Sequence, residues 1–265
     1  MGSIVDIIRR RKSVRSFNGV PLRKEHIDAL QQYISQLVCP FDAKVRINLL
    51  NVDMGEEPVH LGTYGVISGT KSFLTLVVGD SLFSRIAGGY MFEEVILYCT
   101  SLGLGACWLG GTLSRSDFAK QLDMGDDEHL IVVAPVGYQR NKRRTVDSFL
   151  RFTAGSDHRK PFGEIFYDGS FGNPLSEERA EKYLLPLQMV RLAPSASNKQ
   201  PWRVVKTDNA LHFFSHEGPF SVNDIGIALC HFELTCKEEK IEGHFAVLNN
   251  VESVNRNKYI ISWIQ

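Results

Sequence analysis

The chain contains 265 residues, of which 43% are hydrophobic and 23% are charged, a composition typical of a globular protein with one large domain or two small ones. Thirty basic residues balance thirty acidic residues, so no overall field favours nucleic acid or an anionic membrane, and we expect a small-molecule partner. The sequence lacks a run of about 18 apolar residues that could span a bilayer.

Local signals for export, disulfides and metals are also weak. Asp6 and the basic run from Arg9 to Lys12 interrupt the apolar residues near the N-terminus, so we expect a cytoplasmic protein without a secretory signal. The five cysteines form no C-x-x-C pair, which argues against a disulfide framework or a zinc knuckle. His212 and His216 lie four residues apart, but their surroundings favour a strand, so no metal site is predicted.

The hydrophobic periodicity predicts an alternation of helices and strands. In the first half it predicts helices at 3–11, 24–37 and 89–102, and strands at 44–51, 73–79, 106–109 and 130–137. In the second half it predicts helices at 176–192 and 224–239, and strands at 203–206, 211–215 and 243–249. This mixture predicts an α+β fold.

The order of elements in the second half repeats the order in the first, which favours an internal duplication. Similar residues recur at two constant separations. A separation of 154 joins Phe17 to Phe171 and Pro40 to Pro194, and a separation of 137 joins Gly89 to Gly226, Leu104 to Ile241 and Trp108 to Phe245. We therefore expect two tandem half-repeats, at 1–145 and 146–265, with the boundary in an exposed connection.

The segment from Ala193 to Trp202 combines prolines, serines, amides and an indole within ten residues. Each proline disfavours helical backbone in the residue before it, so Ala193 and Gln200 are predicted to be extended. The result would be a stiff loop from which Ser195, Asn198 and Gln200 present hydrogen-bonding groups to one planar, polar ligand.

Two basic segments are candidates for binding phosphate, because guanidinium groups bind phosphate oxygens in a fork geometry. The first runs from Arg9 to Phe17 and contains Ser13 and Arg15; the second runs from Arg140 to Arg144 after the predicted strand that ends at Gly137. A solvated basic patch is the alternative interpretation of the first segment.

The glycine-rich segment from Gly103 to Gly111 begins a G-x-G-x-x-G pattern, but Trp108 breaks it and the segment closes a helix instead of opening one. It is therefore a poor dinucleotide fingerprint. We expect glycine to end the helix here, while Gly110 and Gly111 allow backbone N–H groups to approach a flat ligand.

Together these segments resemble the nitroreductase family of FMN-dependent oxidoreductases. In that family, an R-x-S-x-[RK] segment, a P-S-x-x-N-x-Q-P-W loop, a GLG-containing helix end and a late basic residue after a G-Y strand surround one FMN. The matching residues are Arg11, Ser13 and Arg15; Pro194 to Trp202; Gly103 to Gly111; and Gly137-Tyr138 followed by Arg143 or Arg144. The resemblance implies a nitroreductase-like fold.

The order of these segments differs from the family pattern, in which two short chains form a dimer with flavin sites at the interface. Here the first-half counterpart of the loop, from Pro40 to Lys44, lacks the amides. The second-half counterparts of Arg11, Ser13 and Arg15 are Ile165, Tyr167 and Gly169. The resemblance thus implies a fused pseudo-dimer with one FMN at the interface of its two halves. Such a protein would be a monomer in solution, because the family's dimer is built into one chain.

The resemblance also implies roles for individual residues around FMN. Arg11 and Arg143 or Arg144 would hold the phosphate, and Ser13 and Arg15 would meet the pyrimidine edge or the ribityl chain. Backbone N–H of Gly110 or Gly111 would address N5, and the stretch Gly62 to Val66 would also touch the ring. The complete predicted cofactor set is Arg11, Lys12, Ser13, Arg15, Leu109, Gly110, Gly111, Arg143, Arg144, Pro194, Ser195, Ala196, Asn198 and Gln200.

The activity implied is ping-pong hydride transfer from NAD(P)H, the co-substrate, through flavin N5 to a small-molecule acceptor such as a nitroaromatic or a quinone. No side chain need act as acid or nucleophile, because the flavin carries the chemistry. Two alternatives remain open. One is an FMN-binding protein without NAD(P)H turnover, such as a flavin reservoir, a sensor or a flavin-consuming relative. The other is a degenerate structural protein without cofactor.

Overall fold

A computed structural model describes residues 2–51, 67–110, 118–140 and 158–265. The chain divides into two compact units, one formed by residues 1–9 with 155–265 and the other by residues 10–154. The boundary predicted between residues 145 and 146 lies outside the described residues. Within the described part, none of the helices has both the length and the apolar character required to cross a membrane.

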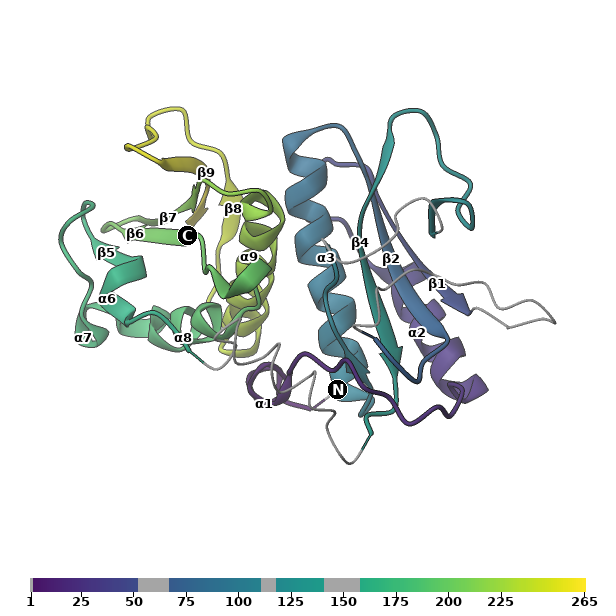
Figure 1. The fold of residues 1–265 in the computed structure, drawn as a ribbon. Coiled ribbons are helices and arrows are strands. Elements are labelled where there is room, and N and C mark those ends of the chain that lie inside the picture. The colour runs from purple at the N-terminus through teal and green to yellow at the C-terminus, as the bar shows by residue number, and fades with distance from the viewer. Residues whose placement is uncertain (1, 52–66, 111–117, 141–157) are drawn as a thin grey trace. The chain divides into compact units, whose positions relative to one another are not determined.

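The unit of residues 10–154 is built on a four-stranded antiparallel sheet with the order β1-β2-β4-β3. Helix α3 packs on β1 and β2, and α2 packs on β1 and α3 (Figure 1). The elements are α2 (Lys24–Gln36), β1 (Val45–Asn51), β2 (Ser72–Gly79), α3 (Leu82–Ser101), β3 (Gly105–Ala106) and β4 (Glu128–Gly137).

Helix α3 begins seven residues earlier than predicted, because the Ser81 side chain caps it by accepting the Ser84 N–H at 3.0 Å. Gly88 and Gly89 lie at the predicted start of the helix, although glycine lowers helix propensity. In the structure both are buried inside α3, and a Cβ on Gly88 would lie 2.7 Å from a methyl carbon of Val78. Gly88 thus permits close contact between α3 and β2.

The second unit is built on a five-stranded sheet with the order β5-β6-β7-β9-β8, in which β5 is parallel to β6 and the other pairs are antiparallel. Helices α8 and α9 pack together, and α9 covers β6 and β7. The elements are α1 (Ile4–Arg10), α6 (Phe162–Ile165), β5 (Phe166–Asp168), α7 (Glu177–Ala180), η1 (Glu181–Tyr183), α8 (Leu184–Leu192), η2 (Ala196–Asn198), β6 (Trp202–Lys206), β7 (Ala210–His216), α9 (Ser221–Glu238), β8 (His244–Ala246) and β9 (Asn257–Ile264).

In this unit one prediction is wrong and one strand was missed. The helix predicted at 176–192 is broken into α7, a 3₁₀ turn and α8, with Glu181 at φ 53°. The break places Pro186 in the first turn of α8, where its missing N–H costs nothing. Strand β9 was not predicted, yet it lies between β7 and β8, and its Trp263 packs edge-on against Phe232 in the core.

The two sheets share a connectivity. In each unit a helix is followed by a strand hairpin, a long helix, a short strand and a long strand, and β1-β2-β4-β3 corresponds to β6-β7-β9-β8. The register also shifts in the same place: between Leu76 and Val77 in β2 and between Phe213 and Phe214 in β7. Leu76 and Phe213 are 137 residues apart, the separation noted above for the long helices.

The ends of the two long helices match in detail. Leu104 N–H donates to Cys99 O at 2.9 Å, and Ile241 N–H donates to Cys236 O at 2.9 Å. The preceding residues, Gly103 and Lys240, both have positive φ, of 74° and 56°. This is the Schellman geometry that commonly ends a helix, so the prediction that glycine ends the first long helix is confirmed.

The correspondence earlier in the chain differs from the predicted separation of 154. Val45 pairs with Val78, and Trp202 pairs with Ser215, so strand register relates Val45 to Trp202, 157 residues apart. Tyr167 lies in β5 beside β6, whereas Ser13 bridges to Ala106 in β3, at the opposite edge of its own sheet. Strand pairing therefore gives no support to the expected match of Arg11, Ser13 and Arg15 with Ile165, Tyr167 and Gly169.

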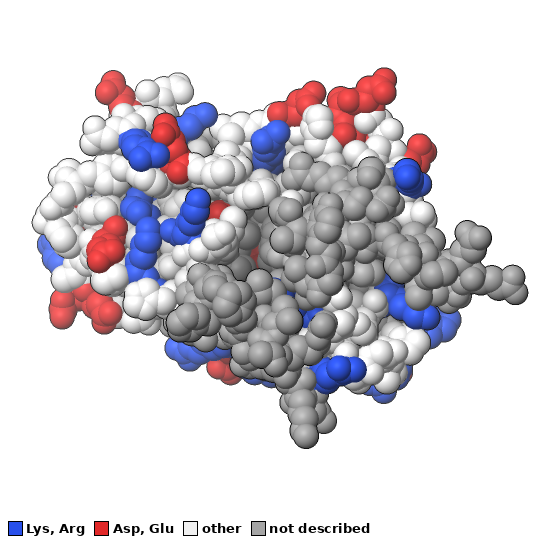
Figure 2. Space-filling model, in the orientation of Figure 1, with Lys and Arg blue, Asp and Glu red and all other residues white. Residues whose placement is uncertain are grey.

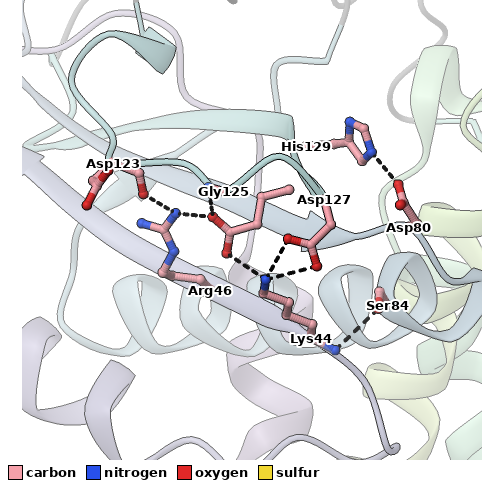
Figure 3. A network of polar contacts seen from close by, with 9 residues as sticks. Lys44, Arg46, Asp80, Ser84, Asp123, Gly125, Asp127 and His129 are labelled. Atoms are coloured by element: carbon pink, nitrogen blue, oxygen red, sulfur yellow. Dashed lines mark hydrogen bonds and ion pairs between the residues drawn. The ribbon is translucent and has the colours of Figure 1, made fainter.

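A polar network ties the start of β1 to the turn before β4 (Figure 3). Lys44 Nζ donates to both Asp127 oxygens at 2.9 and 3.1 Å, and Arg46 donates to Glu128 Oε2 at 2.7 Å. The Arg46 hydrogen bond and the Gly125 N–H hold the pKa of Glu128 below its ordinary value of 4.5. The network holds β1 against the turn before β4, and none of its residues belongs to the predicted cofactor-binding segments.

Candidate functional site

The loop at 193–202 begins where α8 ends, because Pro194 cannot continue the helix. Ala193 is extended as predicted, with φ −54° and ψ 138°. The prediction for Gln200 is wrong: its φ is 48°, in the left-handed region, although a proline follows it. A hydrogen bond from the Lys160 N–H to the Gln200 side chain, together with one from the Gln200 N–H to Ser195 within the loop, overrides the preference set by the proline.

The two amide side chains of the loop bind the segment 158–160 of the same unit. Asn198 Nδ2 donates to His158 O at 2.8 Å, and Asn198 Oδ1 accepts from Arg159 at 2.9 Å. Gln200 is 2% exposed, and its Oε1 accepts the Lys160 N–H at 2.9 Å. These amides therefore shape the loop, a role that sequence reasoning had given to the prolines.

The start of the loop is held by serine and by a carboxyl group that the sequence analysis missed. Ser195 Oγ accepts the Gln200 N–H at 2.8 Å. Both oxygens of Asp224, in the first turn of α9, lie 3.2 Å from Ala196 N. Burial raises the pKa of Asp224 to about 7, although the Ala196 N–H and the charge of Lys199 act in the opposite direction. An aspartate in the first turn of a helix is common, so nothing in the sequence singled it out.

In the other unit, Arg11 lies next to a second buried carboxyl group. Its Nε is 3.7 Å from Glu93 Oε1, and the two side chains are 7% and 0% exposed. Glu93 Oε2 accepts the indole N–H of Trp108 at 2.7 Å. Arg11 Nε itself has no hydrogen-bond partner among the described residues. Glu93 was missed by sequence reasoning, because α3 is buried around most of its circumference and its apolar pattern gives no sign of a carboxyl partner.

The segment that follows Arg11 crosses the short strand β3. Val14 N–H donates to Ala106 O at 2.9 Å, and a Cβ on Gly105 would lie 2.8 Å from the Cβ of Val14. The second glycine of the G-L-G pattern thus allows this close crossing. Within the described residues, the side chains of Lys12, Ser13 and Arg15 make no hydrogen bond or ion pair, which leaves two cations and one hydroxyl for another partner.

The remaining predicted residues divide into described and undescribed positions. Leu109 is buried, and its N–H donates to Val133 O at 2.9 Å, so that group is used by the sheet. Gly110 is half-buried. Gly111, Arg143, Arg144 and the stretch 62–66 lie outside the described residues. The described candidates thus form two groups: Arg11, Lys12, Ser13, Arg15, Leu109 and Gly110 in one unit, and Pro194, Ser195, Ala196, Asn198 and Gln200 in the other.

The histidines considered for a metal have protein partners. His212 Nδ1 lies 2.7 Å from Ser262 Oγ and its Nε2 lies 3.3 Å from Thr207 Oγ1, while His216 Nδ1 lies 3.0 Å from Asn257 Oδ1. Burial lowers the pKa of His212. On the face drawn in Figure 2, both basic and acidic side chains are scattered over the described surface, in agreement with the balanced composition.

Comparison with known proteins gives both a family and a fold. A family model described as "Putative TM nitroreductase" matches residues 3–236. The crystal structure of a putative nitroreductase from Thermotoga maritima is similar with a TM-score of 0.66 and 20% sequence identity, over 99% of this chain and 93% of that chain. No curated protein sequence matches the chain significantly.

Two further structures are similar over about half of the chain. A putative NADH dehydrogenase/NAD(P)H nitroreductase from Bacteroides thetaiotaomicron matches 54% of this chain and 90% of that chain, with 17% identity and a TM-score of 0.44. An FMN-dependent nitroreductase from Clostridium difficile matches 52% and 88%, with 14% identity and a TM-score of 0.43. These two similarities are too weak to support a conclusion about the chain.

The family assignment rests on the family model, which matches most of the chain. Together with the predicted α+β nitroreductase fold, this match establishes that the chain belongs to this nitroreductase family.

Proposed function

We propose that this protein is an FMN-dependent NAD(P)H oxidoreductase. Membership of the nitroreductase family supports the reaction class. The observation that carries the cofactor assignment is the group formed by Lys12, Ser13 and Arg15. These side chains have no partner among the described residues, and they lie on a segment whose backbone is fixed to β3. Ser13 and Arg15 are two residues apart, a spacing that places side chains on the same side of an extended segment. A hydroxyl and a guanidinium on one side, with Lys12 next to them in the sequence, fit an anionic, hydrogen-bonding ligand.

The chain's own residues would divide the work of holding FMN. Arg15 and Ser13 would bind the pyrimidine edge or ribityl chain, and Arg11 with Arg143 or Arg144 would bind the phosphate. From the other unit, Ser195 would contribute its hydroxyl, whose oxygen already accepts the Gln200 N–H. Asn198 and Gln200 would act mainly by fixing the loop, because their amides bind the segment 158–160. This assignment draws residues from both halves of one chain.

Bound FMN would supply two-electron chemistry, accepting hydride from NAD(P)H and passing the electrons to a nitroaromatic, a quinone or a similar acceptor. The protein's contribution would be electrostatic. A guanidinium such as that of Arg15 favours anionic charge on a ligand beside it. The described residues would bind and orient the flavin, and this proposal assigns none of them the role of an acid or a nucleophile.

The test is anaerobic addition of NADPH, and separately NADH, to the purified protein after reconstitution with FMN. We expect the flavin to be retained through gel filtration and its absorbance near 450 nm, an approximate wavelength general to oxidised flavins, to be lost on addition of the nucleotide. Retained flavin that stays oxidised would contradict the oxidoreductase assignment and favour a binding protein. Protein that retains no FMN would contradict both.

A further inference from the structure

The loop at 193–202 has an unusual backbone. Ser197, Asn198 and Gln200 have φ values of 49°, 53° and 48°, and none of them is glycine. Non-glycine residues persist in the left-handed region only where their surroundings determine the conformation. Two sets of contacts fix this loop within its unit: the amides bind the segment 158–160 on one side, and Asp224 of α9 binds Ala196 on the other.

The Asp224 contact differs from the amide contacts because its acceptor can ionise. The residue is 5% exposed, and both carboxyl oxygens lie 3.2 Å from the single N–H of Ala196. Among the described residues, Ala196 is the only hydrogen-bond donor to this carboxyl group and Lys199 is the charged group that acts on it. A carboxylate can accept about four hydrogen bonds, so the ionised form would be buried with most of its acceptor capacity unused.

Because the buried carboxyl group has too few hydrogen-bond donors for its ionised form, the charge of Asp224 is coupled to the position of the loop that covers it. Burial raises the pKa of Asp224 to about 7, because the Ala196 N–H and Lys199 offset burial only in part. A loop displaced far enough to admit water would return the pKa towards its ordinary value of 3.8. The arrangement seen here therefore binds the proton more tightly, and by linkage a rising pH favours the displaced loop.

We propose that Asp224 is a positioning residue for the 193–202 loop: while the carboxyl group is neutral, the loop covers it and keeps its ligand-binding conformation, whereas ionisation of this buried group favours a loop displaced far enough to admit water. The effect on ligand rests on the proposed flavin function. The effect on the loop itself does not, because Ala196 and Asp224 belong to the same unit and their contact exists without ligand.

The first experiment follows the Ala196 amide by ¹H–¹⁵N NMR in the full chain without flavin, from about pH 5.5 to about pH 8.5. We expect an inflection near neutrality in the wild type and none in Asp224→Asn, which is neutral at every pH and keeps an oxygen acceptor. The control is Asp126→Asn, a change at an exposed aspartate, and it should titrate like the wild type. A flat Ala196 profile in the wild type, or an unchanged inflection in Asp224→Asn, would overturn the proposal.

The second experiment measures riboflavin affinity by fluorescence quenching at about pH 6 and about pH 8. Riboflavin is the probe because it lacks the phosphate, whose second ionisation near pH 6 would add its own pH dependence. We expect wild-type binding to weaken by up to about tenfold at the higher pH, and binding to Asp224→Asn to change by less than about twofold.

The outcomes of the two experiments are distinguishable. A wild-type affinity that is the same at both pH values, despite a titrating Ala196, would overturn the link between the loop and the ligand. Failure of riboflavin and FMN to bind any of the proteins would overturn the proposed function, while the Ala196 titration would still decide whether Asp224 controls the loop.

Discussion

At the scale of single residues, Asn198 shows how one amide side chain can fix the backbone of a loop through both of its ends. Its Oδ1 accepts from the Arg159 guanidinium at 2.9 Å and its Nδ2 donates to His158 O at 2.8 Å. Hydrogen bonds that involve a charged group are worth more than neutral ones. Asn198 thus contributes to holding a backbone that has positive φ at three positions.

We expect Asn198→Ala to weaken FMN retention and to lower the free energy of unfolding by about 2 kcal/mol, because the change removes hydrogen bonds on both sides of the amide. Flavin titration and urea unfolding measure the two effects. The control is Asp42→Ala, at an exposed position in the corresponding connection before β1, which should leave FMN binding unchanged. Equal loss of FMN in the two variants would contradict a single site per chain.

Gly105 is a second residue whose role depends on a neighbour distant in sequence. The segment around Val14 crosses β3 so closely that a Cβ at Gly105 would lie 2.8 Å from the Cβ and from both methyl carbons of Val14. Real side chains do not approach so closely, so any larger residue at 105 must displace the segment that carries Ser13 and Arg15.

We expect Gly105→Ala to destabilise the protein by about 2 kcal/mol, through overpacking, and to weaken FMN binding in the same variant. Thermal unfolding with and without FMN measures both effects. Gly218→Ala is the matched control, because a Cβ there would meet only Ser221 Cβ, at 3.9 Å. A Gly105→Ala protein as stable as the control would show that the segment tolerates displacement.

At the scale of elements, α1 depends on a residue from the other end of the chain. Glu238, in the last turn of α9, accepts the Ser3 hydroxyl at 2.7 Å and the backbone N–H groups of Ile4 and Val5. The first N–H groups of a helix have no partner within the helix, so an external carboxylate completes its start. Burial opposes ionisation, but these hydrogen bonds outweigh it and hold the pKa of Glu238 below its ordinary 4.5.

We expect Glu238→Gln to speed hydrogen exchange at Ile4 and Val5 and to cost about 1 kcal/mol of stability at neutral pH. Because the folded pKa is lowered, the wild-type contribution is complete above pH 4.5 and is lost as the pH falls through the folded value, so the two proteins should converge in acid. Glu239→Gln changes the exposed neighbour and serves as control. Unchanged exchange at Ile4 would contradict the capping role.

At the scale of the whole molecule, the two units repeat one connectivity, one register shift and one helix ending. We propose that they descend from a duplication, and that only one copy of each cofactor segment has been kept. The first connection, before β1, lacks the amides of the second, and the positive-φ residue that follows the long helix is Gly103 in the first unit but Lys240 in the second. A pair of identical sites would need both segments in both copies.

The duplication predicts one FMN per chain and a monomer in solution. Light scattering coupled to gel filtration should give the mass of one 29.8 kDa chain, and flavin absorbance after denaturation should give one FMN per protein. Two FMN per chain would contradict the loss of the second site. A stable dimer would show that the family's dimer contacts are not all satisfied within one chain.

The sequence by itself predicted most helices and strands, the helix ending at Gly103 and the family, because periodicity, glycine and short motifs act over a few residues. It could not predict the backbone of Gln200, the carboxyl contacts of Asp224 and Glu93, or strand β9 and its place between β7 and β8. Asp224 reaches Ala196 across 28 positions and Gln200 reaches Lys160 across 40. Only the tertiary structure decides such contacts, since buried polar groups must find partners wherever the folded chain provides them.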